Sequence, residues 1–369
     1  KDENTLLGRA RYGYNWFRGF IQGSTLLETG TGQEPKMGFT YLEVAPGQGI
    51  YTWKDFNGNG LQELDEFEPA RFRDEAAYIR VALPSTDFIP VTSHQFTQVL
   101  SIRPARIAGG KEGNTHFLAR FSNQTAWQTS RKSTAGDPDA YLNPLGRAVP
   151  DSQLVSLSTS LRNTLSFNPS GRIFGLDYQI QEQKSSQLLI NGTESRTLSS
   201  HALNIRLKIA GPLTWMQELE TGSKGFNSQY FTSKNYDIGW LRQKMSLQYQ
   251  PLMQLSMDVG YRYQEKQNQG SEELAFLHEL MAEIRYHHAG KGKISLATSY
   301  LQNSFTGSTG TFIAWEMLEG FLPGKNLTWQ LQYQQTITGG IELLLNYSGR
   351  KLPGTGTIHT GNIQARAVF

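Results

Sequence analysis

Apolar and polar residues alternate with a period of two along most of the chain. The pattern is clear at 155–167, 203–209, 255–264, 327–333 and 341–347. In the second of these segments, Leu203, Ile205, Leu207 and Ile209 interleave with Asn204, Arg206 and Lys208. Successive side chains of a strand point to opposite faces. Each segment therefore predicts a strand with one apolar and one polar face.

The length of these segments narrows the fold class. They run for about 10–14 residues, whereas strands of globular proteins usually have about 5–6. A tilted strand that crosses a bilayer needs about 9–11 residues. Charged residues in mid-strand, such as Arg206, are compatible with a strand face that lines the water-filled interior of a barrel. The sequence therefore favours an all-β, transmembrane antiparallel β-barrel of about 14–18 strands, although a soluble β-sandwich would also show alternation.

Turn signals separate the alternating segments. They include Asn191-Gly192, Gly211-Pro212, Pro323-Gly324 and Gly339-Gly340. We expect about 14 strands from residue 88 to the end and two to four more before residue 54. The segment 274–284 stays ambiguous, because its apolar residues are spaced for a helix about as well as for a strand.

Composition removes several classes of protein. The 369 residues include 35 basic and 32 acidic side chains, a net charge of +3, with no concentrated basic tract. Nucleic acid is therefore not expected as a partner. The absence of cysteine excludes disulfides, thiolate catalysis and thiolate metal sites.

No apolar stretch approaches the roughly 18 residues of a membrane-spanning helix. The sequence opens at Lys1 directly into a strand-like pattern, without the apolar core of a signal peptide. Either a targeting segment has been cleaved or the chain is the C-terminal portion of a longer protein, and we expect the second.

One motif predicts a metal site. Residues 55–66 match the calcium-loop template D-x-N-x-N-G-x5-E. Calcium takes six to eight hard oxygen ligands. The template supplies them from Asp55, Asn57, Asn59, the carbonyl of Leu61, Glu63 (directly or through water) and a bidentate Glu66, with the sharp bend at Gly60.

The flanks of this motif favour an isolated loop. The segment Ile50–Trp53 before it is strand-like, and Gln62 replaces the usual apolar residue after the seventh position. A paired helix–loop–helix is therefore not expected, and calcium would have a structural role. The alternative is an Asn/Gly-rich turn that binds no metal.

Catalytic patterns are weak. The pair His278-Glu279 lacks the second histidine of a zinc helix, because position 282 is Ala. His287 and His288 fit a solvated loop end, and no nucleophile elbow or phosphate-binding glycine loop is present. We therefore expect that the protein is not an enzyme.

The C-terminal strand carries a further signal. Ile363, Ala365, Ala367 and Phe369 share one face of an alternating segment. This segment resembles the terminal strand of outer-membrane barrels, whose last aromatic residue is recognised by the barrel-insertion machinery. The resemblance implies that machinery as a partner of the Phe369 strand.

Three stretches together resemble a group of large, mostly uncharacterised outer-membrane proteins of Bacteroidota. They are Val44–Tyr51 running into the calcium-type loop, Met317–Asn326, and Tyr347–Lys351 followed by His359–Gly361. The resemblance implies a C-terminal β-barrel region in the bacterial outer membrane. It supplies no catalytic residues.

These inferences define an expected organisation. Residues 1–54 would form N-terminal strands, 55–87 the calcium-type loop and a connector, and 88–369 the barrel. The expected function is a non-enzymatic, structural or translocation-linked component of the cell envelope, in contact with membrane lipid and with outer-membrane protein partners. The alternatives are a secreted, calcium-stabilised adhesin or glycan-binding module, and a barrel enzyme with catalytic residues at one rim.

Overall fold

The computed structural model describes residues 7–107, 117–134, 153–288, 290–337 and 340–367. Within them the chain is an all-β protein with seventeen strands and a few short helices. Two compact units are present. Unit 1 is Lys1–Ser170, Leu176–Ala202 and Gly222–Ile238, and unit 2 is Gly171–Gly175, Leu203–Thr221 and Gly239–Phe369.

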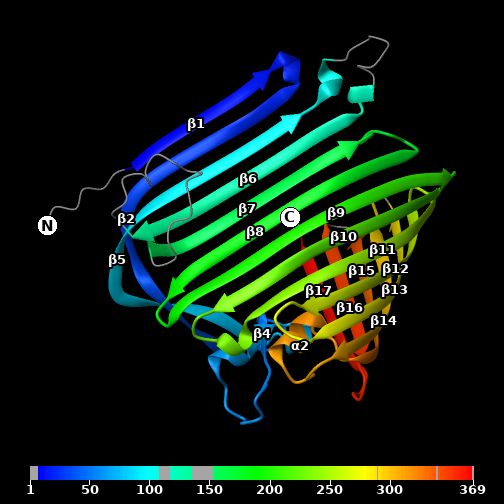
Figure 1. Cartoon of the computed structure of the whole chain (residues 1–369). Coiled ribbons are helices and arrows are strands. Elements are labelled where there is room, and N and C mark those ends of the chain that lie inside the picture. The colour runs from blue at the N-terminus through cyan, green and yellow to red at the C-terminus, as the bar shows by residue number, and fades with distance from the viewer. Residues whose placement is uncertain (1–6, 108–116, 135–152, 289, 338–339, 368–369) are drawn as a thin grey trace. The chain divides into compact units, whose positions relative to one another are not determined.

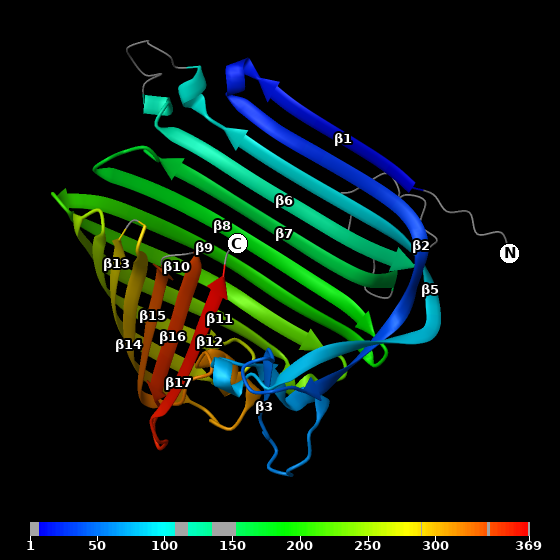
Figure 2. The same ribbon diagram turned by 180° about the vertical axis from the view of Figure 1, so that it is seen from behind.

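Unit 1 contains an antiparallel meander whose strands lie side by side (Figures 1 and 2). Each strand pairs with the next in the order β1, β2, β5, β6, β7 and β8. Their bounds are β1 (Leu7–Trp16), β2 (Ile21–Glu43), β5 (Tyr78–Ile102), β6 (Phe121–Thr134), β7 (Leu154–Phe167) and β8 (Phe174–Leu189). The 3-10 turns η1 (Phe17–Gly19) and η4 (Pro104–Arg106) follow β1 and β5.

Strands β2 and β5 continue past a bulge. Pro35 pairs with Phe88, but Met37 pairs with Pro84, so the register shifts between them. Extra residues on one strand bend the pair and increase its twist. Beyond the bulge, the extension (residues 37–83) adds β3 (Tyr51–Trp53), β4 (Phe67–Pro69), η2 (Leu64–Glu66) and η3 (Arg73–Glu75).

The extension has an aromatic core. The rings of Tyr41 and Phe67 stack with centroids 4.1 Å apart, and Phe67 also meets Tyr78 edge-on at 4.9 Å. Phe67 is buried. The strand pair β3–β4 encloses the calcium-type loop, so this core fixes both ends of that loop.

Unit 2 contains a second antiparallel meander, in which each strand from β12 to β17 pairs with the next (Figure 2). The bounds are β12 (Leu255–Asn268), β13 (Leu274–His288), β14 (Gly292–Thr306), β15 (Gly324–Ile337), β16 (Ile341–Lys351) and β17 (Ile358–Ala367). The helix α2 (Phe312–Met317) lies in the connection between β14 and β15.

The strands β9 (Gly192–Ala210), β10 (Leu213–Ser228) and β11 (Tyr236–Leu252) contribute residues to both units. The 3-10 turn η7 (Thr232–Lys234) precedes β11 and belongs to unit 1. Among the described residues, no helix has the length and hydropathy needed to span a membrane.

The structure confirms the all-β antiparallel class and resolves the ambiguous segment. Residues 274–284 belong to β13, which pairs along its length with β12 and with β14. Helical spacing is outweighed there because both strand edges have partners. The terminal Phe369 lies outside the described residues.

Two expectations differ from the structure in detail. β2 has 23 residues and β5 has 25, longer than the expected strands, because both run on through the bulge into the extension. β5 also crosses residue 87, where the connector was expected to end. That expected boundary therefore does not coincide with the end of an element.

Candidate functional site: the two faces of unit 2 and the calcium-type loop

One face of the unit 2 meander presents apolar side chains that remain exposed. Val259 is 59% exposed, Leu280 55% and Leu296 45%. Directly paired residues of antiparallel strands point to the same side. The register pairs Val259 with Ala282 and Leu296 with Ile284, so these side chains share what we call the apolar face.

The opposite face is polar and buried. Lys266 is only 3% exposed, and further buried members of this polar face are Gln264, Asn268, Asn303, Asn326 and Arg350. Arg262, Glu279, Leu301 and Asn326 occupy consecutive paired positions across four strands, and three of these four side chains are polar. Polar side chains therefore form the covered side of this sheet, and apolar side chains form its open side.

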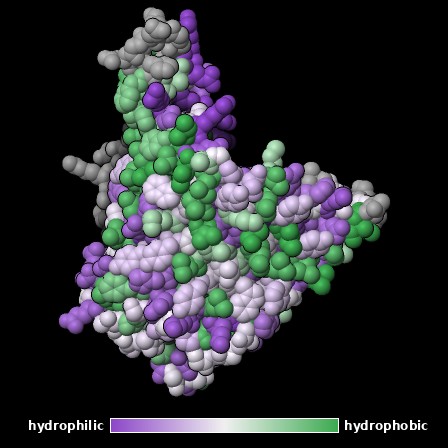
Figure 3. Space-filling view, turned by 90° about the vertical axis from the view of Figure 1, so that its right-hand side faces the viewer, coloured by the Kyte–Doolittle hydropathy of each residue, from purple (hydrophilic) through white to green (hydrophobic). Residues whose placement is uncertain are grey.

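This arrangement is the reverse of a water-soluble sheet. Burying a Val or Leu side chain is worth about 1.5–3 kcal/mol, so a sheet in water normally covers its apolar face. Figure 3 shows hydrophobic side chains at the surface in patches between hydrophilic ones. The apolar face of unit 2 needs an apolar environment that the described residues do not provide.

Aromatic residues mark one end of the apolar face. Tyr263 on β12, Trp329 on β15 and Tyr347 on β16 occupy it near the end where β16 finishes. Further toward that end, the same face carries Glu265, Lys325 and Lys351. The face therefore changes from apolar through aromatic to charged along its strands.

Two of the aromatic side chains at this end are hydrogen-bonded to histidines. Tyr261 Oη lies 2.7 Å from His278 Nδ1, and Tyr347 Oη lies 2.8 Å from His359 Nδ1. Each pair joins neighbouring strands. His278, which the sequence placed in an incomplete zinc pattern, therefore has a tyrosine hydroxyl as a partner.

The segment that connects β14 to β15 is anchored on the polar face. In the cover segment (residues 307–323), Thr311 caps α2 by accepting a hydrogen bond from the Ala314 N–H at 3.2 Å. Met317, Leu318 and Phe321 are buried. Leu277 and Leu301 on the polar face are buried as well. Apolar side chains of the cover segment and of the polar face are therefore both removed from water, as expected if the segment folds over these strands.

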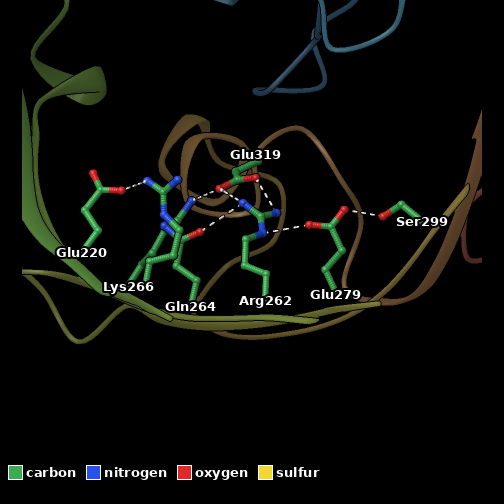
Figure 4. A network of polar contacts seen from close by, with 8 residues as sticks. Glu220, Arg262, Gln264, Lys266, Glu279, Ser299 and Glu319 are labelled. Atoms are coloured by element: carbon green, nitrogen blue, oxygen red, sulfur yellow. Dashed lines mark hydrogen bonds and ion pairs between the residues drawn. The ribbon is translucent and has the colours of Figure 1, made fainter. Parts of the chain in front are cut away.

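An ion network fastens the cover segment to β12 (Figure 4). Glu319 Oε2 lies 3.2 Å from Arg262 Nη2, and Glu319 Oε1 lies 2.9 Å from Lys266 Nζ. Arg262 Nε also lies 2.8 Å from Glu279 Oε2, and the Ser299 hydroxyl donates to Glu279. Burial alone raises the pKa of the Glu319 carboxyl, but Lys266 and Arg262 outweigh it and lower that pKa to about 2.

Asp55, Asn57, Asn59 and Glu63 are exposed in the calcium-type loop, whereas Glu66 is buried at its end. The Asp55 carboxylate accepts the N–H groups of Gly58 and Gly60 at 2.7 and 2.9 Å. Asn57 Oδ1 accepts from the Asn59 N–H, and Asn59 Oδ1 accepts from the Leu61 N–H. These bonds orient the three side chains that begin the template.

The two glutamates complete the loop. Glu63 Oε2 accepts from the amides of Asn57 and Asn59 at 2.5 and 3.4 Å. Glu66 is buried, and its Oε2 accepts from Trp53 Nε1 at 2.8 Å. Glu66 Oε1 has no hydrogen-bond partner among the described residues. The oxygen donors fit a hard cation, and the buried free oxygen is one that such an ion would satisfy.

Within the described ranges, no three His, Cys, Asp or Glu side chains cluster closely enough to hold a metal ion. The three predicted carboxylate ligands of the calcium-type loop, Asp55, Glu63 and Glu66, therefore do not form such a cluster. The other predicted ligands are Asn57, Asn59 and the Leu61 carbonyl.

Sequence reasoning missed the ion network. Arg262, Lys266 and Glu279 are scattered charges in the sequence, and Glu319 lies more than fifty residues beyond β12. The Met317–Asn326 stretch was distinctive in sequence, but nothing local indicated which residues it would contact.

Comparisons with known proteins give little further guidance. No protein-family model matches the chain, and no curated protein sequence matches it. Among solved structures, the FrpB iron transporter from Neisseria meningitidis (F3-3 variant) is similar with a TM-score of 0.37 and 9% identity, over 95% of this chain. The chain spans 62% of that transporter's length. At this TM-score the likeness carries no argument about fold or function.

Proposed function

We propose that the chain forms part of the wall of a bacterial outer-membrane β-barrel. In this proposal the apolar face of unit 2 contacts lipid, and the polar face and its cover segment line the interior. The protein acts as a non-enzymatic, structural or translocation-linked component of the envelope, together with other outer-membrane proteins.

The observation that carries this proposal is the reversal of the two faces of unit 2. Val259, Leu280 and Leu296 are exposed, while Lys266 and Gln264 on the other face are buried. Lipid tails remove the apolar face from water, and paired strands leave no backbone group unsatisfied in hydrocarbon. A barrel wall is therefore the simplest environment for this sheet.

The aromatic end of the apolar face supports the same environment. Tyr and Trp are enriched where a barrel wall meets the lipid headgroups. Tyr263, Trp329 and Tyr347 precede Glu265, Lys325 and Lys351 on their strands. We assign this change of character to one boundary of the membrane.

Adjacent substitutions on β14 test the proposal. Leu296 faces the apolar side, and Ala297 faces the polar side opposite Glu283. Leu296→Arg would place a charge in lipid at a cost of about 2–4 kcal/mol, whereas Ala297→Arg would meet a carboxylate. We expect Leu296→Arg to reduce the fraction that folds into lipid vesicles at least tenfold, and Ala297→Arg to leave it nearly unchanged.

The measurement is the heat-modifiable gel mobility of each protein after refolding into vesicles. A closed membrane barrel migrates differently before and after boiling. Equal tolerance of both substitutions, with one band that boiling does not shift, would contradict the proposal and favour the secreted adhesin or glycan-binding alternative.

The terminal strand belongs to the same proposal. β17 presents Ile363 on the apolar face and ends at Ala367, two residues before Phe369. In our proposal the barrel-insertion machinery recognises the Phe369 strand. The location in Bacteroidota likewise remains a proposal that depends on the sequence resemblance.

Calcium binding by residues 55–66 is a second element of the proposal. It is supported by the orientation of Asp55, Asn57 and Asn59 and by the buried free oxygen of Glu66. Asp55, Asn57, Asn59, Glu63, Glu66 and the Leu61 carbonyl would hold the ion. Its role is structural, because it would join both ends of one loop in the extension.

Limited proteolysis tests this site. We expect calcium to protect residues 45–75 of the parent protein and to give no added protection when Asp55→Ala and Glu66→Ala are combined. Asp65→Ala is the control, because it removes a carboxylate from a position that the template does not use. Equal calcium-dependent protection of the parent and the double variant would remove calcium from the proposal.

A further inference from the structure

The cations on β12 are oriented by neighbours other than the cover segment. Arg262 Nε lies 2.8 Å from Glu279 Oε2. Arg262 Nη1 also donates to Gln264 Oε1 at 3.4 Å. The guanidinium is therefore held by strand residues of the polar face, with its remaining N–H groups directed at Glu319 (Figure 4).

Glu319 is delivered to these cations by an unusual backbone conformation. Its φ is 57°, and Gly320 follows with a φ of 76°. A non-glycine residue rarely adopts a positive φ, because the Cβ then crowds the backbone. Tertiary contacts therefore hold the carboxylate against β12 in a conformation that the local chain disfavours.

Charge balance depends on this carboxylate. Arg262 and Lys266 carry two positive charges, and Glu279 and Glu319 carry two negative ones. Lys266 is almost fully buried, and a buried ammonium without a countercharge is strongly destabilised. If Glu319 is withdrawn, Arg262 and Lys266 lose the carboxylate that they share.

We propose that Arg262 and Lys266 form an anion-binding site for a carboxylate-bearing ligand, and that the Glu319 side chain is the occupant present in this structure. The planar guanidinium matches a carboxylate with paired donors, and the lysine adds a compact charge. The Glu319 side chain keeps 23% exposure, so a soluble anion can reach and replace it. Replacement would release the cover segment from β12.

Two measurements on detergent-solubilised protein test the site, with acetate as the probe. In the parent protein, acetate competes with Glu319, so proteolysis within residues 307–323 should accelerate. In Glu319→Ala, the same segment should be cleaved about tenfold or more faster than in the parent, because a buried pair has lost one partner. Acetate should then slow this cleavage by filling the vacated position.

The controls separate binding from salt screening. Chloride at matched ionic strength should neither accelerate cleavage of the parent nor slow cleavage of Glu319→Ala. Inorganic phosphate serves as the second oxyanion. Glu272→Ala, an exposed carboxylate in the β12–β13 turn, should behave like the parent. Rescue of Glu319→Ala should vanish when Arg262→Gln is added.

The proposal would be overturned if acetate and chloride changed the cleavage rate equally. It would also be overturned if acetate accelerated, or slowed, cleavage of both the parent and Glu319→Ala. Rescue by phosphate and not by acetate would overturn the carboxylate assignment. The competition between acetate and Glu319 is measured in the parent protein, so the site is still tested if Glu319→Ala fails to fold. These assays use no bilayer, so their outcome is independent of the membrane test on β14.

Discussion

A charged side chain can be buried at low cost only when a countercharge or a hydrogen-bond partner lies beside it, and the polar face of unit 2 follows this rule. Lys266 and Arg262 share the Glu319 carboxylate, and Arg262 is also paired with Glu279. At the scale of single residues, the attachment of the cover segment therefore depends on protonation of one carboxyl group.

The pH dependence of this attachment follows from the pKa of Glu319. In the folded protein the pKa is about 2, below the ordinary value of 4.5. The ion network therefore stabilises the cover segment fully above about pH 4.5, and this contribution is lost as the pH falls toward 2. The difference is of the order of 3 kcal/mol.

We expect cleavage within residues 307–323 by an acid-active protease to rise as the pH falls through this window. Glu319→Gln should be cleaved rapidly at every pH and should show a much weaker pH dependence. A parent profile that runs parallel to that of Glu319→Gln would show that another group controls the segment.

At the scale of elements, β2 and β5 each belong both to the meander of unit 1 and to the extension. β2 and β5 run through unit 1 and then, past the bulge at Pro35, build the extension that carries the calcium-type loop. A buried ion pair between Lys234 and Glu68 joins η7 to β4 of this extension. The side-chain exposure of both residues is low, so solvent screens the pair weakly.

Removing one charge tests how much the pair stabilises the extension. Glu68→Gln leaves the Lys234 ammonium without its carboxylate, and breaking a buried pair in this way costs about 3–5 kcal/mol. We expect faster hydrogen exchange in residues 50–80, with β12–β17 unchanged.

Glu43→Gln at the exposed end of β2 is the matched control for charge removal. If the two variants exchange at the same rate, the Lys234–Glu68 pair does not stabilise the extension.

At the scale of the whole molecule, the proposed membrane location predicts that some tryptophans contact lipid and others do not. Trp329 lies on the apolar face and covers Gly349, where an added Cβ would meet the indole at 2.2 Å. Trp53 lies in the extension and donates to Glu66 at 2.8 Å. Only the first should reach lipid in our proposal.

Brominated lipids can measure this difference in single-tryptophan proteins. We expect strong quenching of Trp329 fluorescence in vesicles and little quenching of Trp53, because bromine quenches only at short range. Equal quenching of both, or none, would contradict the assignment of the apolar face to lipid.

Much of the strand architecture could be predicted from the sequence, because alternation is a local property. Leu255, Met257 and Val259 share a face whatever the rest of the chain does, since successive side chains of a strand point to opposite sides. The candidate ligands of the calcium-type loop could be proposed from the sequence, because all six lie within twelve positions of the chain, and calcium binding there stays a prediction. The spacing of Leu274, Leu277 and Met281 left the segment ambiguous, because strand partners on both sides, which decide the matter, are not visible in a local pattern.

The sequence by itself determined that the chain is all-β, which positions alternate and which residues could ligate calcium, since each depends on spacing within a short segment. Only the tertiary structure decided that the apolar side chains of unit 2 stay exposed while Lys266 is buried. It also decided that Glu319 meets Arg262, because strand register and the fold of the cover segment bring together residues far apart in the chain. Burial and ion pairing depend on such distant neighbours, and no local pattern encodes them.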